Sequence, residues 1–105
     1  MTELRILAAA EAEYLSAAQW YAERSATAAD GFTTAVAAAL RRILEQPEWG
    51  AACDAVHRQV IVRGYAFVIV YRAEDTPVPA ARLLVVAVAH SSRRPDYWAE
   101  RSPRG

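Results

Sequence analysis

The stretch Arg82-Leu-Leu-Val-Val-Ala-Val-Ala-His90 decides the fold of this chain. Its seven central residues are all apolar, and a segment that is apolar on both faces is typical of a strand at the centre of a sheet. Two further strand signals precede it. Tyr65 to Arg72 is rich in aromatic and β-branched residues, Val56 to Arg63 alternates in part, and Gly64 marks the turn between them. Short connections between these strands predict a three-strand meander over about residues 56–90.

Two helices are predicted in the alanine-rich half of the chain. Leu4 to Leu7 favours a short first strand, and residues 8–24 favour a helix because alanine is the best helix former. A second helix, with a capping box predicted at Thr27 and Asp30, ends near Pro47. Its apolar stripe at helical spacing consists of Phe32, Val36, Ala39, Leu40, Ile43 and Leu44. The short link between the helices predicts an antiparallel hairpin over about residues 8–46.

Together these elements predict a small α+β domain. Their order is β-α-α-β-β-β, with a mainly antiparallel sheet packed against the helical hairpin. The length of 105 residues fits a single domain over residues 1–105. Residues 74–79 contain two prolines and favour a loop before the last strand, and residues 91–105 form a tail after it.

The charged residues have an unusual composition, because all twelve basic residues are arginines. Arginine keeps its charge, so chemistry that needs a lysine base is excluded. The net charge is zero, but residues 56–105 hold eight arginines and four acids, whereas residues 1–55 hold four arginines and eight acids. The single cysteine, Cys53, excludes an internal disulfide. We find no signal peptide and no membrane span, and we expect a cytoplasmic protein without a metal or cofactor.

The tail behind the last strand gathers charged and aromatic side chains. Arginine pairs hold phosphates or carboxylates, so these residues are candidates for binding a target or a partner. The candidates are Arg58, Arg63, His90, Arg93, Arg94, Tyr97 and Trp98. Histidine is the best available acid or base near neutral pH, so a catalytic role for Arg58, His90, Arg93 and Tyr97 is an alternative. The structural alternatives are a hydrogen-bonded His90, an Arg58 paired with a carboxylate, and an aromatic pair folded back as a core lid.

Features along nearly the whole chain resemble the RelE/ParE family of bacterial type II toxin–antitoxin toxins, on its ParE-like, plasmid-stabilisation side. The features are Trp20-Tyr21, the helix from Phe32 to Pro47, Arg58, the strand Tyr65–Arg72, Val86–His90, Arg93-Arg94-Pro95 and Tyr97-Trp98. The resemblance implies a growth-inhibiting toxin that is neutralised by an antitoxin, whose disordered segment folds as it wraps the toxin. It also implies one of two targets, because characterised ParE toxins inhibit DNA gyrase and RelE-like toxins cleave mRNA on the ribosome.

The absence of lysine bears on the choice between these targets. RNA cleavage needs a base, an acid and cations on the phosphate, and RelE-type enzymes commonly supply lysines among them. We therefore expect a non-catalytic toxin that inhibits gyrase by protein binding. One alternative is a ribosome-dependent endoribonuclease that uses His90, the arginines and Tyr97. Another is an interaction module of the same fold that has lost its toxicity.

A toxin that a partner keeps inactive is expected to expose an apolar groove when it is alone. The helix-pair surface with Leu15, Trp20 and Val36 is one candidate for the antitoxin groove, and the edge of the sheet is another. Free chains could also pair as homodimers through the same surface.

Overall fold

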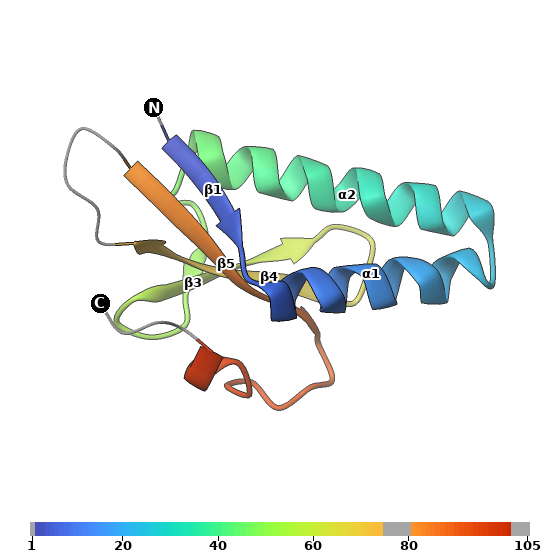
Figure 1. The fold of residues 1–105 in the computed structure, drawn as a ribbon. Helices are drawn as coiled ribbons and strands as arrows, with labels where there is room; N and C mark the ends of the chain where they lie inside the picture. Colours follow the sequence, from blue (N-terminus) through green and yellow to red (C-terminus); the bar gives the residue numbers. More distant parts are fainter. Residues whose placement is uncertain (1, 75–80, 102–105) are drawn as a thin grey trace.

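The structure is a computed structural model that describes residues 2–74 and 81–101 (Figure 1). Its elements follow the order β1 (Thr2–Ile6), α1 (Ala8–Ala22), α2 (Ala26–Glu45), β2 (Ala51–Ala52), β3 (His57–Val62), β4 (Phe67–Glu74), β5 (Ala81–His90) and a short 3-10 helix, η1 (Ala99–Arg101). The strands form one sheet in the order β1-β5-β4-β3-β2. The predicted α+β class and the order β-α-α-β-β-β are confirmed, and β2 is an added two-residue strand.

The apolar strand β5 lies inside the sheet, as its sequence predicts. It pairs in parallel with β1, where Leu4 lies opposite Leu83, and antiparallel with β4, where Phe67 lies opposite His90. All side chains from Leu83 to Ala89 are buried, which confirms that neither face of this strand meets water. The other neighbouring strands, β4 with β3 and β3 with β2, are antiparallel.

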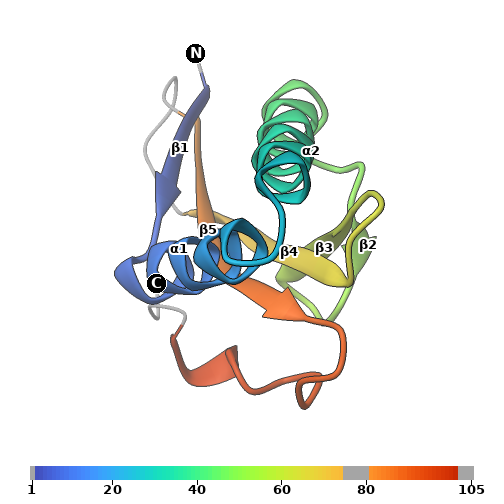
Figure 2. The ribbon, with the colours of Figure 1, turned by 90° about the vertical axis from the view of Figure 1, so that its right-hand side faces the viewer.

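The helical hairpin covers one face of the sheet (Figure 2). The inner side of α2 buries Phe32, Val36, Ala39 and Ile43 against Val60, Val62, Ile69 and Val85 of the strands. An aromatic cluster closes the end of this core. Phe32 lies at its centre, with ring centroids 5.1 Å from Tyr21 and 5.4 Å from Phe67. Aromatic contacts at these distances add to the free energy gained by burial.

The tail covers the other face of the sheet, away from the helices (Figure 1). The indole of Trp98 is 4% exposed and packs with Val70, Leu84, Val86 and Ala89. The ring of His57 lies 4.7 Å from it, centroid to centroid. The alternative in which the aromatic pair folds back as a core lid therefore describes Trp98. Its burial removes this indole from the surface that a target could contact, which corrects its place among the binding candidates.

Two local predictions concern the ends of α2. The capping box at Thr27 and Asp30 is wrong, because Ser25 is the N-cap residue. Ser25 has an extended backbone, and its hydroxyl oxygen accepts a hydrogen bond from the Ala28 N–H at 3.1 Å. The predicted end before Pro47 is confirmed, since α2 ends at Glu45.

The two predicted connections of the meander lie at Gly64 and at residues 74–79. Gly64 has a φ of +88°, a left-handed conformation that favours glycine, so the turn between β3 and β4 is confirmed. In the predicted loop 74–79, Glu74 closes β4 and the other residues lie outside the described part of the chain. Residues 102–105 of the predicted tail also lie outside it.

Candidate functional site

The tail is held against α1 by one carboxylate, that of Glu13. The hydroxyl of Tyr97 donates to Glu13 Oε2 at 2.5 Å, and the Arg101 guanidinium donates to both carboxylate oxygens, at 2.9 and 3.0 Å. The backbone N–H of Val88 donates to Oε1 at 3.0 Å, and Arg93 Nη1 lies 3.9 Å from Oε2. We call Glu13, Tyr97 and Arg101 the tail clamp. Sequence analysis predicted Tyr97 as a site residue and missed Glu13 and Arg101.

The tail clamp occupies a place where β5 has lost its strand neighbour. Pairing with β1 ends at Val85, which lies opposite Ile6, so the next residues of β5 need other partners on that side. Glu13 accepts the N–H of Val88, and Arg101 Nη1 lies 3.5 Å from the carbonyl oxygen of Val86. Side chains from a helix and from the tail thus replace a missing strand, which gives the clamp a structural role.

The protonation states in the clamp follow from these contacts. Burial and the hydrogen bond to Glu13 raise the pKa of Tyr97 to about 12. Burial by itself would raise the pKa of Glu13, but the hydrogen bonds from Arg101, Tyr97 and Val88 outweigh it and the pKa is lowered. At neutral pH the phenol is therefore protonated and the carboxylate is charged. Neither group has a pKa near 7, where a general acid or base works best.

The remaining predicted arginines lie in different places. Arg58 Nη1 donates to the carbonyl oxygens of Gly50, at 2.8 Å, and Glu48, at 3.3 Å, so it fastens the segment after α2 rather than pairing with a carboxylate. Arg94 is exposed and its Nε lies 3.6 Å from Asp96 Oδ1. Arg63 is exposed at the end of β3. The structure therefore does not gather the predicted arginines into one site.

A cleft of about 530 Å³ between α1 and the end of β5 does bring His90 and Arg93 together, next to Glu13 and Trp20. The Nδ1 atom of His90 accepts a hydrogen bond from the N–H of Ser92 at 3.0 Å, so in the neutral ring the proton is on Nε2. The Arg93 guanidinium lies 3.8 Å above the Tyr97 ring. This cleft contains a histidine and the positively charged Arg93, while the carboxylate in its lining, that of Glu13, is already bound by the tail.

The three residues of the predicted antitoxin groove do not share one surface. Leu15 and Val36 line a groove of about 440 Å³ between α1 and α2, where Leu15 is 55% exposed. Val36 is only 5% exposed and belongs to the floor. Trp20 lies apart from them, in the lining of the His90 cleft, with the Arg24 guanidinium 3.6 Å above its ring. The prediction of a single helix-pair surface is corrected in this respect.

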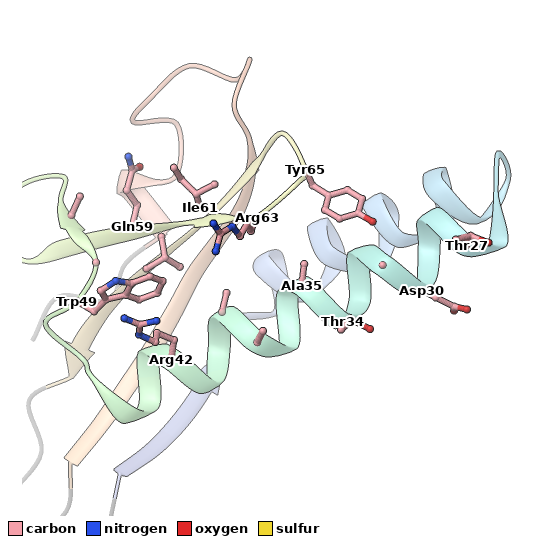
Figure 3. A pocket seen from close by; sticks show the side chains of 16 residues that line it. Thr27, Asp30, Thr34, Ala35, Arg42, Trp49, Gln59, Ile61, Arg63 and Tyr65 are labelled. Carbon is pink, nitrogen blue, oxygen red and sulfur yellow. The ribbon is translucent and has the colours of Figure 1, made fainter.

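A larger groove, of about 1060 Å³, runs between α2 and the outer edge of β3 (Figure 3). Small side chains of α2, including Ala35 and Ala38, line it together with Ile61 and Trp49. Ile61 is 70% exposed and Trp49 is 43% exposed, although both are apolar. We call this surface the α2–β3 groove. Sequence analysis named the sheet edge as a candidate surface but predicted none of these residues for it.

Residues 4–95 match the model of the ParE toxin of the type II toxin–antitoxin system, parDE. The chain belongs to the ParE toxin family. This confirms the predicted family and its coarse function, a toxin of a type II toxin–antitoxin system. A comparison with curated proteins found no match.

The extent of the match separates two parts of this ParE-family toxin. It runs from β1 to the turn after β5 and stops before Tyr97, Trp98 and Arg101. Glu13 therefore lies within the matched region, while its partners in the tail clamp follow it. Among residues 2–74 and 81–101, no cluster of histidine, cysteine and acidic residues could hold a metal ion. None of the helices in the described ranges is long and apolar enough to cross a membrane.

Proposed function

We propose that this ParE-family toxin arrests growth in the cytoplasm by binding DNA gyrase, and that a cognate antitoxin neutralises it by covering its exposed apolar surface. Membership of the ParE family supports the toxin function. The tail clamp is the observation that favours binding over catalysis, because it engages Tyr97, one of the candidate groups for an RNA-cleaving site.

The groups in the tail clamp are poorly suited to proton transfer. Cleavage at a 2′-hydroxyl requires a base and an acid whose pKa values lie near the working pH. The phenol of Tyr97 has a pKa of about 12 and donates its hydrogen bond to Glu13. The chain contains no lysine that could replace it. The clamp is therefore suited to holding the tail in place rather than to moving protons.

The surface of the domain supports protein binding. An exposed large apolar side chain flanks each groove beside α2, Leu15 in one and Trp49 in the other. Contiguous apolar surface on a soluble domain marks sites of protein–protein contact. Two such grooves support a toxin with more than one protein contact, one for an antitoxin and one for a target.

The decisive experiment is a supercoiling assay with purified gyrase and relaxed plasmid. We expect the wild-type toxin to inhibit supercoiling, and we expect the variant His90→Ala to inhibit it equally. A lack of inhibition at a large excess of toxin would contradict the gyrase target. Induction in cells without a partner separates a third possibility, since unchanged growth would identify an interaction module that has lost its toxicity.

The His90 cleft favours a second candidate function, ribosome-dependent mRNA cleavage, because it places a histidine beside Arg93. Primer extension on translated mRNA after induction tests this candidate. New cuts that disappear in both His90→Ala and Arg93→Ala would support it and would displace the gyrase proposal. Intact mRNA in growth-arrested cells would exclude it.

A further inference from the structure

The outer edge of β3 is only partly covered. The two-residue strand β2 pairs with β3 at Arg58 and Gln59, through Ala52 and Ala51 respectively. No other described strand pairs with β3 on this side, so the edge is open from Val60 to the turn at Gly64. An open edge presents unpaired N–H and C=O groups to any extended chain that approaches it.

The direction of these backbone groups follows from one hydrogen bond. The N–H of Cys53 donates to the carbonyl oxygen of His57 at 2.8 Å, so the backbone groups of His57 point away from β4. In an antiparallel strand the bonding direction alternates with each residue. The N–H and C=O of Ile61, four residues after His57, therefore also point to the open side. The opposite side of Ile61 lies against Val68 of β4.

The α2–β3 groove lies directly beside this edge (Figure 3). Its wall on α2 consists of small side chains, among them Ala35 and Ala38. Side chains alternate between the two faces of a strand, so an added strand would direct every second side chain toward α2. The small alanines leave room there for apolar side chains of moderate size.

The charges of the groove indicate what an added strand should carry. Figure 3 shows Arg42 and Arg63 beside Trp49 at one end of the groove and Asp30 at the other end. Arg42 Nε donates to Gln46 Oε1 at 3.1 Å, and its guanidinium lies 4.6 Å from the Trp49 ring centroid. Neither Arg42 nor Arg63 forms an ion pair with a carboxylate of residues 2–74 or 81–101. Two exposed, positively charged arginines favour a partner with acidic side chains.

We propose that the open edge of β3 binds an extended, acidic segment of a partner protein as an added strand. Its backbone pairs with Ile61 and continues toward Arg63, its apolar side chains fill the groove above Ala35 and Ala38, and its carboxylates meet Arg42 and Arg63. Strand addition draws affinity from main-chain hydrogen bonds and specificity from alternate side chains. The inference rests on the proposed function in one respect, that the toxin acts through protein partners.

Other occupants fit the observations less well. A second copy of the chain would bring the same two arginines to the groove, with Asp30 as the one carboxylate among the groove residues, so its charges match less well. A nucleic acid would satisfy the arginines, but it would leave the N–H and C=O groups of the edge and the alanine wall without suitable contacts. The combination of open backbone, small apolar side chains and two arginines without an ion pair to a carboxylate of the described residues therefore favours an acidic peptide segment.

The test begins with a phage-displayed library of random decapeptides selected on the purified toxin. We expect the enriched peptides to alternate β-branched residues with Asp or Glu. The most enriched peptide is then labelled with fluorescein, and its Kd is measured by fluorescence anisotropy. The variant Ile61→Pro lacks the outward N–H and loses no hydrogen bond to β4. Proline is tolerated at a position where the N–H of an edge strand faces solvent.

Expected changes separate backbone pairing from side-chain contact. Ile61→Pro should weaken peptide binding by about tenfold, because it removes one main-chain bond and leaves its acceptor unpaired. Ile61→Ala keeps the N–H and should bind more tightly than Ile61→Pro. Arg63→Gln should weaken binding by about threefold at low salt and less at high salt, while Arg94→Gln, at an exposed arginine outside the groove, is the matched control.

Several outcomes would overturn the proposal. These are an enriched peptide with equal affinity for the wild type and Ile61→Pro, enrichment of basic peptides, tighter binding of a labelled 12-nucleotide RNA than of any peptide, or a concentration-dependent dimer that Ile61→Pro abolishes. If Ile61→Pro does not fold, amide hydrogen exchange of the wild type decides instead, because the bound peptide must protect the N–H groups of Ile61 and Arg63. The supercoiling assay uses no peptide and the binding assay uses no gyrase, so failure of the gyrase proposal and failure of strand addition would be recognised separately.

Discussion

At the scale of single residues, Glu13 is the side chain on which the position of the tail depends. Its carboxylate accepts hydrogen bonds from Tyr97, Arg101 and the backbone of Val88, and only 16% of the side chain is exposed. Hydrogen bonds that involve a charged group contribute more than neutral ones. Removal of its charge should therefore lower the free energy of unfolding of the whole domain.

We expect Glu13→Gln to lower the free energy of unfolding by about 2 kcal/mol, because the amide keeps one acceptor oxygen and leaves Arg101 without its counter-charge. The measurement is urea unfolding followed by circular dichroism, with an unchanged m-value. Glu11→Gln, at an exposed residue of the same helix, is the control and should change the free energy by less than about 0.5 kcal/mol. Equal effects for the two variants would contradict the importance of the clamp.

The stability of the domain should depend on pH through the protonation of Glu13. Folding lowers the pKa of this carboxyl group, so its contribution is complete above the unfolded pKa of about 4.3 and is lost as the pH falls through the lower folded value. Asp54, whose pKa is also lowered, should contribute in the same direction. We expect wild-type stability to fall more steeply below about pH 4 than that of Glu13→Gln. Parallel curves in acid denaturation would rule this out.

At the scale of elements, Ser25 and Thr27 near the start of α2 are both of a residue type that commonly caps a helix. The structure assigns the N-cap to Ser25, whose hydroxyl oxygen accepts from the Ala28 N–H. Ser25→Ala should cost about 1 kcal/mol of stability, whereas Thr27→Ala, inside the helix, should cost less than about 0.5 kcal/mol. Thermal unfolding of both variants measures the difference, and the reverse order would restore the capping box predicted from sequence.

The tail behaves as an element of the core through Trp98. Removing a fully buried aromatic side chain typically costs about 3–5 kcal/mol, so Trp98→Ala should be severely destabilised. Trp20→Ala is the matched control, because its indole is 50% exposed and should cost much less. Tryptophan fluorescence during guanidinium unfolding compares the two. A small loss of stability in Trp98→Ala would show that the fold does not depend on the packing of the tail against the face of the sheet away from the helices.

Sequence patterns predicted those elements whose signal is local. The stripe from Phe32 to Ile43 and the apolar run of β5 show their burial in a few consecutive residues, so both were found. The strand β2 has only two residues and too little length for a periodic pattern. The tail clamp joins Glu13 to Arg101, 88 positions later, and no local pattern records such a contact. The sequence could therefore name binding candidates as single residues but could not place them relative to one another.

At the scale of the whole molecule, the two apolar grooves of the toxin lie beside α2, and the tail packs on the face of the sheet away from the helices. A ligand that binds only the folded state stabilises it by about 2.7 kcal/mol when present at one hundred times its Kd. We expect this stabilisation when the acidic peptide selected for the α2–β3 groove is added to the wild type. The same peptide concentration should stabilise Ile61→Pro far less in a thermal melt. Equal shifts would place the peptide elsewhere on the surface.

The parallel pairing of β1 with β5 has a consequence for synthesis on the ribosome. The strand β5, which lies between β1 and β4, is the last of the described strands to be translated, and it is the only described neighbour of β1. Contacts between distant parts of a chain form late, after the loop between them has closed. A nascent chain that stops before β5 has no strand to join β1 to the meander. We therefore expect chains that end before β5 to lack the folded sheet and to be inactive.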